Sequence, residues 1–338
     1  DNLHRKRLTL ERKNGLDEYI RLRRQKYGSV LYDSLSAEER TTIHSQIANY
    51  LESTQSLHNI NIVQQLGNHF RRGDIPEKAF QYLALAAIRL WDRGLKQNAL
   101  QQVDYATPLT KLAKQRLSDS QFSEARLRLL QVSSAYAHNQ GEWREALKLF
   151  KTQLRYAKTL KQWKTITQTK LSIGDVHSRL GELDKAQQCF HEVLEESRKH
   201  NHRLTEVEAY YQLCGLEWDL GHTQEALTYA QMGLDLTEPN EICLPKAKIL
   251  LSISSVRAHL GQLSLASEQM QTAAHILREL SQKELLGIVL CNHAELLLWR
   301  GFWVEAQELA TESLQLARQS LYQIGQAHTR YILAKIAM

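Results

Sequence analysis

The stretch that decides the fold is Gly181-Glu-Leu-Asp-Lys-Ala186-Gln-Gln-Cys-Phe190, because its pattern occurs at four other places in the chain. Each copy has a glycine, an alanine five residues later and a small, aromatic or methionine residue four residues after that, and the glycines are forty residues apart. The copies are Gly141, Ala146 and Phe150; Gly181, Ala186 and Phe190; Gly221, Ala226 and Ala230; Gly261, Ala266 and Met270; and Gly301, Ala306 and Ala310. A fixed period of this length indicates stacked structural repeats.

The glycine in each copy is expected to end one helix before the next begins. An apolar helical pattern precedes it, as in Leu127, Leu130, Ser134 and Ala137. Glycine ends such a helix because it adopts a left-handed conformation at low cost. The following alanine is small, so a second helix can lie close to the first, and the residue four positions later falls on the same face. One hairpin cannot bury both of its faces, so successive hairpins must stack.

These positions resemble the signature of the tetratricopeptide repeat (TPR) family, which has a small residue one turn before the glycine, then the alanine, then an aromatic. The small position holds Ser134, Gly174, Cys214, Ser254 and Ala294. TPR units are usually about 34 residues long, so the period of forty is similar to the longer-helix variant of LGN-type scaffolds and MalT-type bacterial regulators. The proline expected at the repeat end is mostly missing, and only Pro239 and Pro245 lie near a boundary. The resemblance implies an all-α fold, a right-handed superhelical TPR-like solenoid of helical hairpins.

The pattern divides the chain into regions. A region of five forty-residue repeats spans 127–326, with boundaries at 127–166, 167–206, 207–246, 247–286 and 287–326. Residues 327–338 are predicted to form a capping or truncated repeat helix. Over 59–126 the period breaks, and Gly73 and Gly94 mark the turns of irregular TPR-like hairpins with helices expected near 61–72, 76–92 and 96–114.

Residues 1–58 are predicted to form a helical linker behind a winged-helix remnant. Ser36 and Glu39 have the spacing of a capping box, and an apolar stripe follows on the helix that they begin. The stripe consists of Ile43, Ile47, Tyr50 and Leu51.

This part of the chain resembles the linker behind the nucleotide-binding module of STAND-type signalling ATPases, with a similar layout behind some bacterial cyclases and kinases. The matching residues are Tyr32, Ser34, Leu35, Arg40, Ile43, His44, Ile47, Ala48, Leu51, Glu52, Gly73, Asp74, Lys78 and Ala79. The segment around Tyr19–Leu35 corresponds to the winged-helix remnant. The sequence has no G-x-x-x-x-G-K-[ST] loop, so the resemblance implies a nucleotide-binding module in a longer parent chain and not in these residues.

Charge is concentrated at the start of the chain. The formal net charge is +6, and residues 1–30 hold nine Lys or Arg and four acidic residues. The remainder is nearly neutral, which disfavours nucleic-acid binding along its length. No apolar stretch approaches the length of a membrane-spanning helix, and the four cysteines form no C-x-x-C pair, so we expect no membrane partner and a cytoplasmic location.

The sequence lacks the motifs of common catalytic sites. There is no H-E-x-x-H, G-x-S-x-G or dinucleotide-binding glycine pattern. His200 and His202 have a spacing that can bind a metal weakly, but their place at a helix end favours an ordinary surface loop. We therefore expect no enzyme activity, no cofactor and no metal site.

The first helices of TPR hairpins line the concave face, so residues forty apart are predicted to lie side by side there. The residues predicted to bind a ligand are Arg128, Gln131, Gln168, Asp175, Arg179, Glu208, Tyr211, Gln212, Trp218, Lys248, Ser252, Asn292, Glu295 and Trp299. Tyr211, Trp218 and Trp299 are the expected anchors, although Trp218 and Trp299 can equally fill gaps between hairpins. The asparagines and lysines of a chaperone-tail clamp are not present in successive repeats.

These features predict a non-catalytic binding or scaffold arm of a larger signalling protein of the STAND-ATPase type. Its partner would be a protein, a peptide or a small effector on the concave face. Two alternatives stay open: a free-standing adaptor of the LGN type, and the ligand-sensing part of a transcription regulator whose basic start touches DNA.

Overall fold

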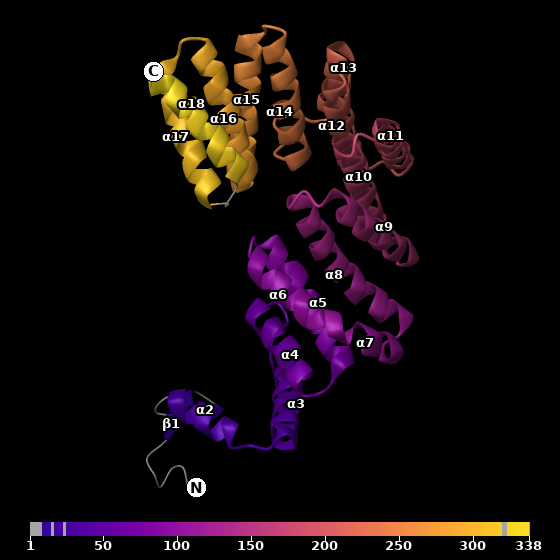
Figure 1. The fold of residues 1–338 in the computed structure, drawn as a ribbon, viewed down its shortest axis with the longest axis vertical. Helices are drawn as coiled ribbons and strands as arrows, with labels where there is room; N and C mark the ends of the chain where they lie inside the picture. The colour runs from indigo at the N-terminus through magenta and orange to yellow at the C-terminus, as the bar shows by residue number, and fades with distance from the viewer. Residues whose placement is uncertain (1–8, 15–16, 23–24, 320–322, 338) are drawn as a thin grey trace. The chain divides into compact units, whose positions relative to one another are not determined.

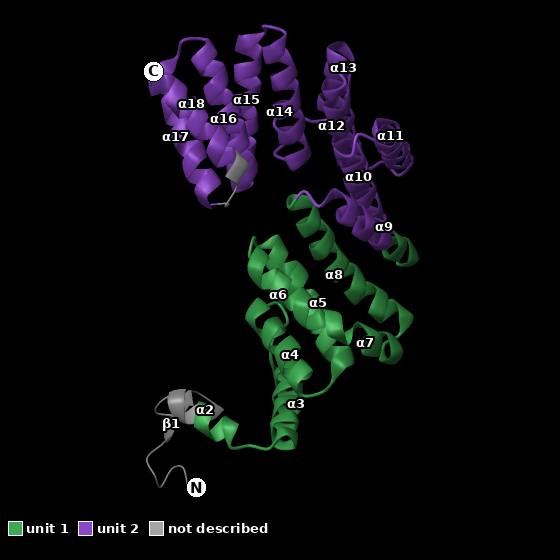
Figure 2. Cartoon of the chain, viewed as in Figure 1, with its two compact units in different colours: residues 1–140, 155–161 green, residues 141–154, 162–338 purple. Residues whose placement is uncertain are grey.

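The computed structural model describes residues 9–14, 17–22, 25–319 and 323–337. The chain divides into two compact units (Figure 2). The first unit holds residues 1–140 and 155–161, and the second holds residues 141–154 and 162–338. Helix α9 (Trp143–Thr159) contributes to both.

The second unit is a series of helical hairpins (Figure 1). Its helices beyond α9 are α10 (Trp163–Arg179), α11 (Leu183–Lys199), α12 (Arg203–Asp219), α13 (Thr223–Asp235), α14 (Leu244–His259), α15 (Leu263–Glu279), α16 (Lys283–Trp299), α17 (Trp303–Gln319) and α18 (Gln323–Ala337). Consecutive helices pack against each other throughout this series. The predicted all-α architecture of stacked hairpins is confirmed, and the first helices begin three or four residues before the predicted repeat boundaries.

The repeated glycines occupy the turn between the two helices of each hairpin. Gly141, Gly181, Gly221, Gly261 and Gly301 all have φ between 75° and 82°. This is the left-handed region that glycine enters without steric cost, so the role predicted for these glycines is confirmed.

The repeated small residues form the seam inside the hairpins from α10 onward. The alanines five residues after the glycines are fully buried, and Phe190 is 1 % exposed. The small positions of the first helices are also buried, from Ser134 to Ala294. Close approach of the two helices therefore depends on the residues that the repeat pattern singled out.

A second left-handed turn joins one hairpin to the next, and here the residue is not glycine. Lys161, Asn201 and Ser281 have φ of 53°, 55° and 55°. These residues again follow the forty-residue period, with one member replaced by a loop over residues 236–243. Helix α13 is four residues shorter than α12, and the loop takes up those residues, so the period is preserved.

Side chains on either side hold this loop in place. Lys246 is 4 % exposed, and its Nζ donates to the carbonyl oxygens of Glu238 and Pro239 at 2.6 and 2.5 Å. Arg203 forms two hydrogen bonds with the carboxylate of Glu241, at 2.7 and 2.8 Å.

The first unit begins with an antiparallel hairpin of β1 (Thr9–Asn14) and β2 (Asp17–Leu22), in which Thr9 pairs with Leu22. The helices that follow are α2 (Gln25–Asp33), α3 (Ala37–Thr54), α4 (Ile60–Arg72), α5 (Pro76–Asp92), α6 (Lys96–Ala106), α7 (Thr110–Arg116) and α8 (Asp119–Asn139). Their core joins α4, α5, α6 and α8.

Three details of the first unit differ from the sequence-based expectation. The helix expected over 96–114 is broken by a 3-10 turn at Thr107–Leu109, because Pro108 cannot donate a backbone hydrogen bond. The left-handed residue after α4 is Asp74, with φ 53°, and not Gly73. Gly73 is needed because an added Cβ would lie 2.8 Å from the backbone nitrogen of Ser45.

The third difference concerns the apolar stripe of α3. The predicted capping box is present, with Ser36 and Glu39 bonded reciprocally. However, Ile43, Ile47 and Tyr50 are exposed, whereas His44 and Ala48 are buried. The helix therefore turns a less apolar face to the core than periodicity predicts.

Candidate functional site

The first helices of the second unit contact one another directly, in the order α10, α12, α14, α16 and α18. We call the surface that they share the first-helix face. Because each helix repeats its neighbour at a distance of forty residues, side chains forty apart are brought together on this face. The predicted ligand-binding residues that belong to these helices can be located on it one by one.

The clearest pair on the first-helix face is Glu208 of α12 and Lys248 of α14. Lys248 Nζ lies 2.8 Å from Glu208 Oε1, and the two side chains are 22 % and 15 % exposed. The same ammonium lies 5.7 Å from the ring centroid of Tyr211, which is a cation–π contact. A predicted aromatic anchor thus lies beside a predicted cation and its acidic partner.

Asp175 and Arg179 of α10 extend this group to a third helix. They form an ion pair at 3.6 Å, and both act electrostatically on Tyr211. Burial raises the pKa of Tyr211 above its usual value, with the charge of Lys248 opposing that change. The hydroxyl of Tyr211 is neutral at physiological pH and can donate a hydrogen bond. We call Asp175, Arg179, Glu208, Tyr211 and Lys248 the central cluster.

Other predicted residues of α12 and α14 lie in structural contacts. Ser252 lies near the thiol of Cys214, whose pKa burial raises to about 12, so this thiol stays protonated. The half-buried Trp218 packs in the core of these helices and meets His259 edge-on, with ring centroids 5.2 Å apart. Trp218 therefore makes packing contacts within these helices.

Asn292 and Glu295 of α16 lie near α18. Asn292 lines a small hollow of about 60 Å³ together with His328, and Glu295 lies 3.6 Å from Nε2 of His328. His328 was not predicted, although it follows Lys248 by two repeats in the same column. The repeat pattern alone could have identified it.

The remaining predicted residues are not joined to the central cluster by any contact that the structure defines. Gln168 is exposed and Gln212 is half-buried. Trp299 is 58 % exposed, so it does not fill a gap between hairpins. Arg128 and Gln131 belong to the first unit, where Arg128 pairs with Glu124 at 3.4 Å.

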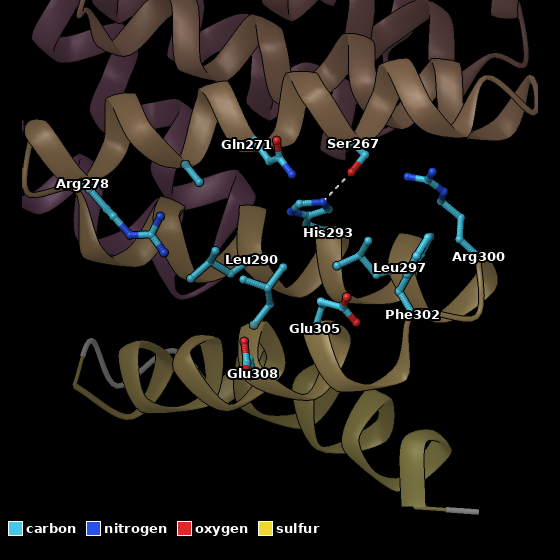
Figure 3. Close-up of a pocket in the computed structure, with 12 residues that line it drawn as sticks. Ser267, Gln271, Arg278, Leu290, His293, Leu297, Arg300, Phe302, Glu305 and Glu308 are labelled. Atoms are coloured by element: carbon cyan, nitrogen blue, oxygen red, sulfur yellow. Dashed lines mark hydrogen bonds between the residues drawn. The ribbon is translucent and has the colours of Figure 1, made fainter.

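A larger hollow in the second unit lies away from the predicted residues. It has a volume of about 460 Å³ and is bounded by α15, α16 and α17 (Figure 3). The sequence-based prediction did not include it, because most of its lining residues lie on the second helices α15 and α17.

Histidines and cysteines form no metal-binding group in the residues that the structure describes, where no three His, Cys, Asp or Glu side chains converge. His200 and His202 instead pack against the ring of Trp163, with centroids 4.5 and 5.5 Å away. Within the same described residues, no helix is both long enough and apolar enough to cross a membrane.

Comparison with known proteins gives structural similarity only. No protein-family model matches the chain, and no curated protein matches its sequence. Among solved structures, the Rap conjugation gene regulator of plasmid pLS20 in complex with the Phr* peptide has a TM-score of 0.55 and 14 % identity, covering 92 % of this chain and 93 % of that one. The apo form of the quorum sensor NprR from B. thuringiensis has a TM-score of 0.54 and 11 % identity, covering 92 % of each chain.

A third similar structure is a signal transduction ATPase with numerous domains (STAND) from Pyrococcus horikoshii, which has a tetratricopeptide repeat sensor. Its TM-score is 0.51 at 14 % identity, covering 98 % of this chain and 54 % of that one. These similarities and the hairpin series define the chain as a TPR-like all-helical repeat protein. Proteins of this architecture bury their core between neighbouring repeats and leave long surfaces of side chains free for recognition.

Proposed function

We propose that the chain is the non-catalytic binding arm of a larger signalling protein of the STAND-ATPase type, and that its first-helix face recognises an extended peptide of a protein partner. The observation that supports this best is the central cluster. Three successive first helices contribute an aromatic ring, two cations and two carboxylates to one place. Such a mixture suits a peptide, whose backbone offers donors and acceptors at regular intervals.

The pairing of charges within the central cluster favours a peptide over a strongly anionic ligand. Arg179 and Lys248 already have carboxylate neighbours at 3.6 and 2.8 Å. A polyanion would have to displace Asp175 and Glu208, whereas a peptide with mixed charge can exchange one ion pair for another. The Rap regulator of similar fold is bound to a peptide, which is consistent with this choice.

The place of the chain in a larger protein is proposed from two observations. Residues from Tyr32 to Ala79 resemble the linker of STAND-type ATPases, and the similar archaeal protein combines the ATPase with a repeat sensor. A P-loop sequence upstream in the same gene would support the proposal. A helix-turn-helix sequence downstream would instead favour a transcription regulator.

Peptide selection tests the proposed binding face. Peptides selected on the intact chain from a displayed library of short random sequences are measured against the variant Tyr211→Ala with Lys248→Ala. Loss of an anchor and its cation should weaken binding about tenfold or more, while the helical circular-dichroism signal is unchanged. The control is Tyr50→Ala with Lys148→Ala, which removes the same residue types from exposed positions elsewhere.

Binding that depends only on second helices, or only on residues 1–60, would contradict a receptor role for the first-helix face. The non-catalytic part of the proposal has its own test. We expect the purified chain to hydrolyse no ATP, and turnover that one substitution in this chain abolishes would overturn that expectation.

A further inference from the structure

The hollow between α15 and α17 has the size of a ligand pocket. Its volume is about 460 Å³, within the range of roughly 300–1,000 Å³ that is common for binding sites. Figure 3 shows Ser267 and Gln271 of α15 on one side, His293 of α16 between the helices, and Glu305 and Glu308 of α17 on the other side. The hollow therefore opens on the second helices and is separate from the central cluster.

Comparison with the other repeats explains why the hollow exists here. The position of Ala274 is occupied by leucine in the other four second helices, at 154, 194, 234 and 314. In the preceding repeat, Leu234 packs in the core, and Arg257 reaches across to the Oε1 atom of Gln231 at 3.2 Å. The preceding repeat thus has a leucine that packs against the core at this position, and the smaller Ala274 leaves more space.

The floor of the hollow is polar where three other repeats are apolar. His293 stands where those repeats have Ile173, Leu213 and Ile253. Its Nε2 lies 2.8 Å from Ser267 Oγ, and burial together with the charge of Arg300 lowers its pKa to about 4. A neutral imidazole beside a hydroxyl can both donate and accept a hydrogen bond.

The walls and rim add apolar and aromatic surface. Leu290, Leu297 and Leu309 line the hollow, and Phe302 lies at its edge, 42 % exposed. The other repeats have Glu, Glu, His and Gln at the position of Phe302, so the fold does not require an aromatic there. Apolar walls around a polar floor fit an aromatic ring with a hydrogen-bonding tip.

The same turn exposes further apolar side chains. Trp299, Trp303 and Val304 are 58 %, 55 % and 68 % exposed. Exposed apolar clusters of this kind commonly mark protein interaction sites. The occupant of the hollow is therefore better matched by a side chain of a partner peptide than by a free metabolite.

Charges at the rim specify what should flank that side chain. Within the described residues, Arg300 makes no ion pair, and its guanidinium lies 5.0 Å from the Phe302 ring centroid. Glu305 and Glu308 on α17 likewise have no ion-pair partner there, whereas Arg278 is bound to both carboxylate oxygens of Glu312. An acidic group near Arg300 and a basic group near the two glutamates would complete this arrangement.

We propose that the hollow between α15 and α17 is a second binding site, which takes a tyrosine-like side chain of a partner peptide between an acidic and a basic residue. This site goes beyond the proposed function, because its helices differ from those of the central cluster and it recognises a different feature of a peptide. The two sites can be inactivated separately.

The test again uses a displayed library of short random peptides, now selected on Tyr211→Ala with Lys248→Ala so that the central cluster is disabled. Counter-selection uses Ala274→Leu, which fills the hollow with the residue that the other repeats carry. We expect the retained peptides to share an aromatic residue with a hydrogen-bonding tip between an acid and a base. A synthetic copy should bind about tenfold or more weakly to Ala274→Leu.

A second variant protects the test against misfolding of Ala274→Leu. Phe302→Gln introduces the residue found at the same position one repeat earlier, Gln262, on the exposed rim, so thermal unfolding should not change while the synthetic peptide binds several-fold more weakly. Replacing the peptide's tyrosine by phenylalanine should also weaken binding. The proposal is overturned if no peptide distinguishes the open from the filled hollow, or if the retained peptides lack an aromatic residue.

Discussion

The ring of Phe190 lies directly against Gly174, leaving no space for a side chain there. A Cβ added to Gly174 would lie 2.9 Å from both Cδ1 and Cζ of Phe190, closer than carbon atoms in contact normally approach. Phe190 is 1 % exposed and cannot move aside freely. This contact is one instance of the close seam between first and second helices that the repeat pattern predicts.

We expect Gly174→Ala to destabilise the protein by about 1–3 kcal/mol, because overpacking outweighs the better helix propensity of alanine. Gly215 is the matched control, since it also lies inside a first helix but has nothing within 4 Å of an added Cβ. Gly215→Ala should stabilise by about 0.5–1 kcal/mol. Urea unfolding of both variants checks the prediction, and equal shifts of the same sign would contradict the seam.

The left-handed residues between hairpins give a second prediction. Lys161 and Ser281 hold φ near +53° and +55°, a conformation that costs an ordinary residue about 1–2 kcal/mol. Lys161→Gly and Ser281→Gly should each stabilise the protein by some tenths to about 1 kcal/mol after the entropy of glycine is subtracted. Asn201→Gly should gain less, because asparagine tolerates this region.

Thermal unfolding measures these gains in stability. The control is the opposite substitution, glycine to alanine, at a left-handed position that already holds glycine. Gly181→Ala places a Cβ at φ 75° without creating any new contact, so its loss of stability reports the backbone conformation alone. If the three glycine variants destabilised the protein, the assigned left-handed turns would be wrong.

Burial of His293 predicts a pH dependence of stability. Its pKa falls from the usual 6.5 to about 4 in the folded protein, so the unfolded chain takes up this proton first as the pH decreases. The free energy of unfolding should therefore decline by up to roughly 3 kcal/mol as the pH falls from 6.5 to about 4. Above pH 6.5, His293 should cause no change of stability with pH. His293→Gln keeps a hydrogen-bonding group beside Ser267 but cannot titrate.

Urea unfolding across this pH range should show a shallower decline for His293→Gln than for the natural protein. His44 and His69 also have lowered pKa values because of burial, and their contribution is common to both proteins. The difference between the two curves isolates His293, and parallel curves would show that it titrates normally.

The sequence predicts the repeated part of the fold well because the signals there are periodic. Gly181, Ala186 and Phe190 each occupy a position set by backbone geometry or close packing, so their neighbours could be inferred. The same reasoning placed Glu208 beside Lys248. Outside the repeats the prediction is weaker. Pro108 breaks the helix expected over residues 96–114, and Ile43, Ile47 and Tyr50 of the predicted apolar stripe face solvent.

The hollow between α15 and α17 could not be predicted from apolar periodicity, because it arises from the small side-chain volume of one residue, Ala274. Ala274 satisfies the helical pattern as well as leucine does, and only comparison with the same position of other repeats reveals the missing volume. Likewise, Trp218 and Trp299 stand at different repeat positions, three and two residues before the repeat glycine, and one is half-buried whereas the other is 58 % exposed. Leu298, which stands at the position of Trp218, is buried, and Asp219, which stands at the position of Trp299, is exposed, so the repeat position accounts for the difference.

The pairing of Glu208 with Lys248 gives the last prediction, a double-mutant cycle. The two side chains are 15 % and 22 % exposed and 2.8 Å apart, so their attraction is less screened than that of a surface pair. With Glu208→Gln and Lys248→Met, we expect a coupling of about 1 kcal/mol in the free energy of unfolding, decreasing with added salt.

The control is a cycle of Glu208 with Lys283, because Lys283 lies on α16 and interacts with Gln319 instead. That cycle should give a coupling near zero. A coupling near zero for Glu208 and Lys248 as well would mean that side chains forty residues apart do not meet on the first-helix face. The binding site proposed there would then lose its structural basis.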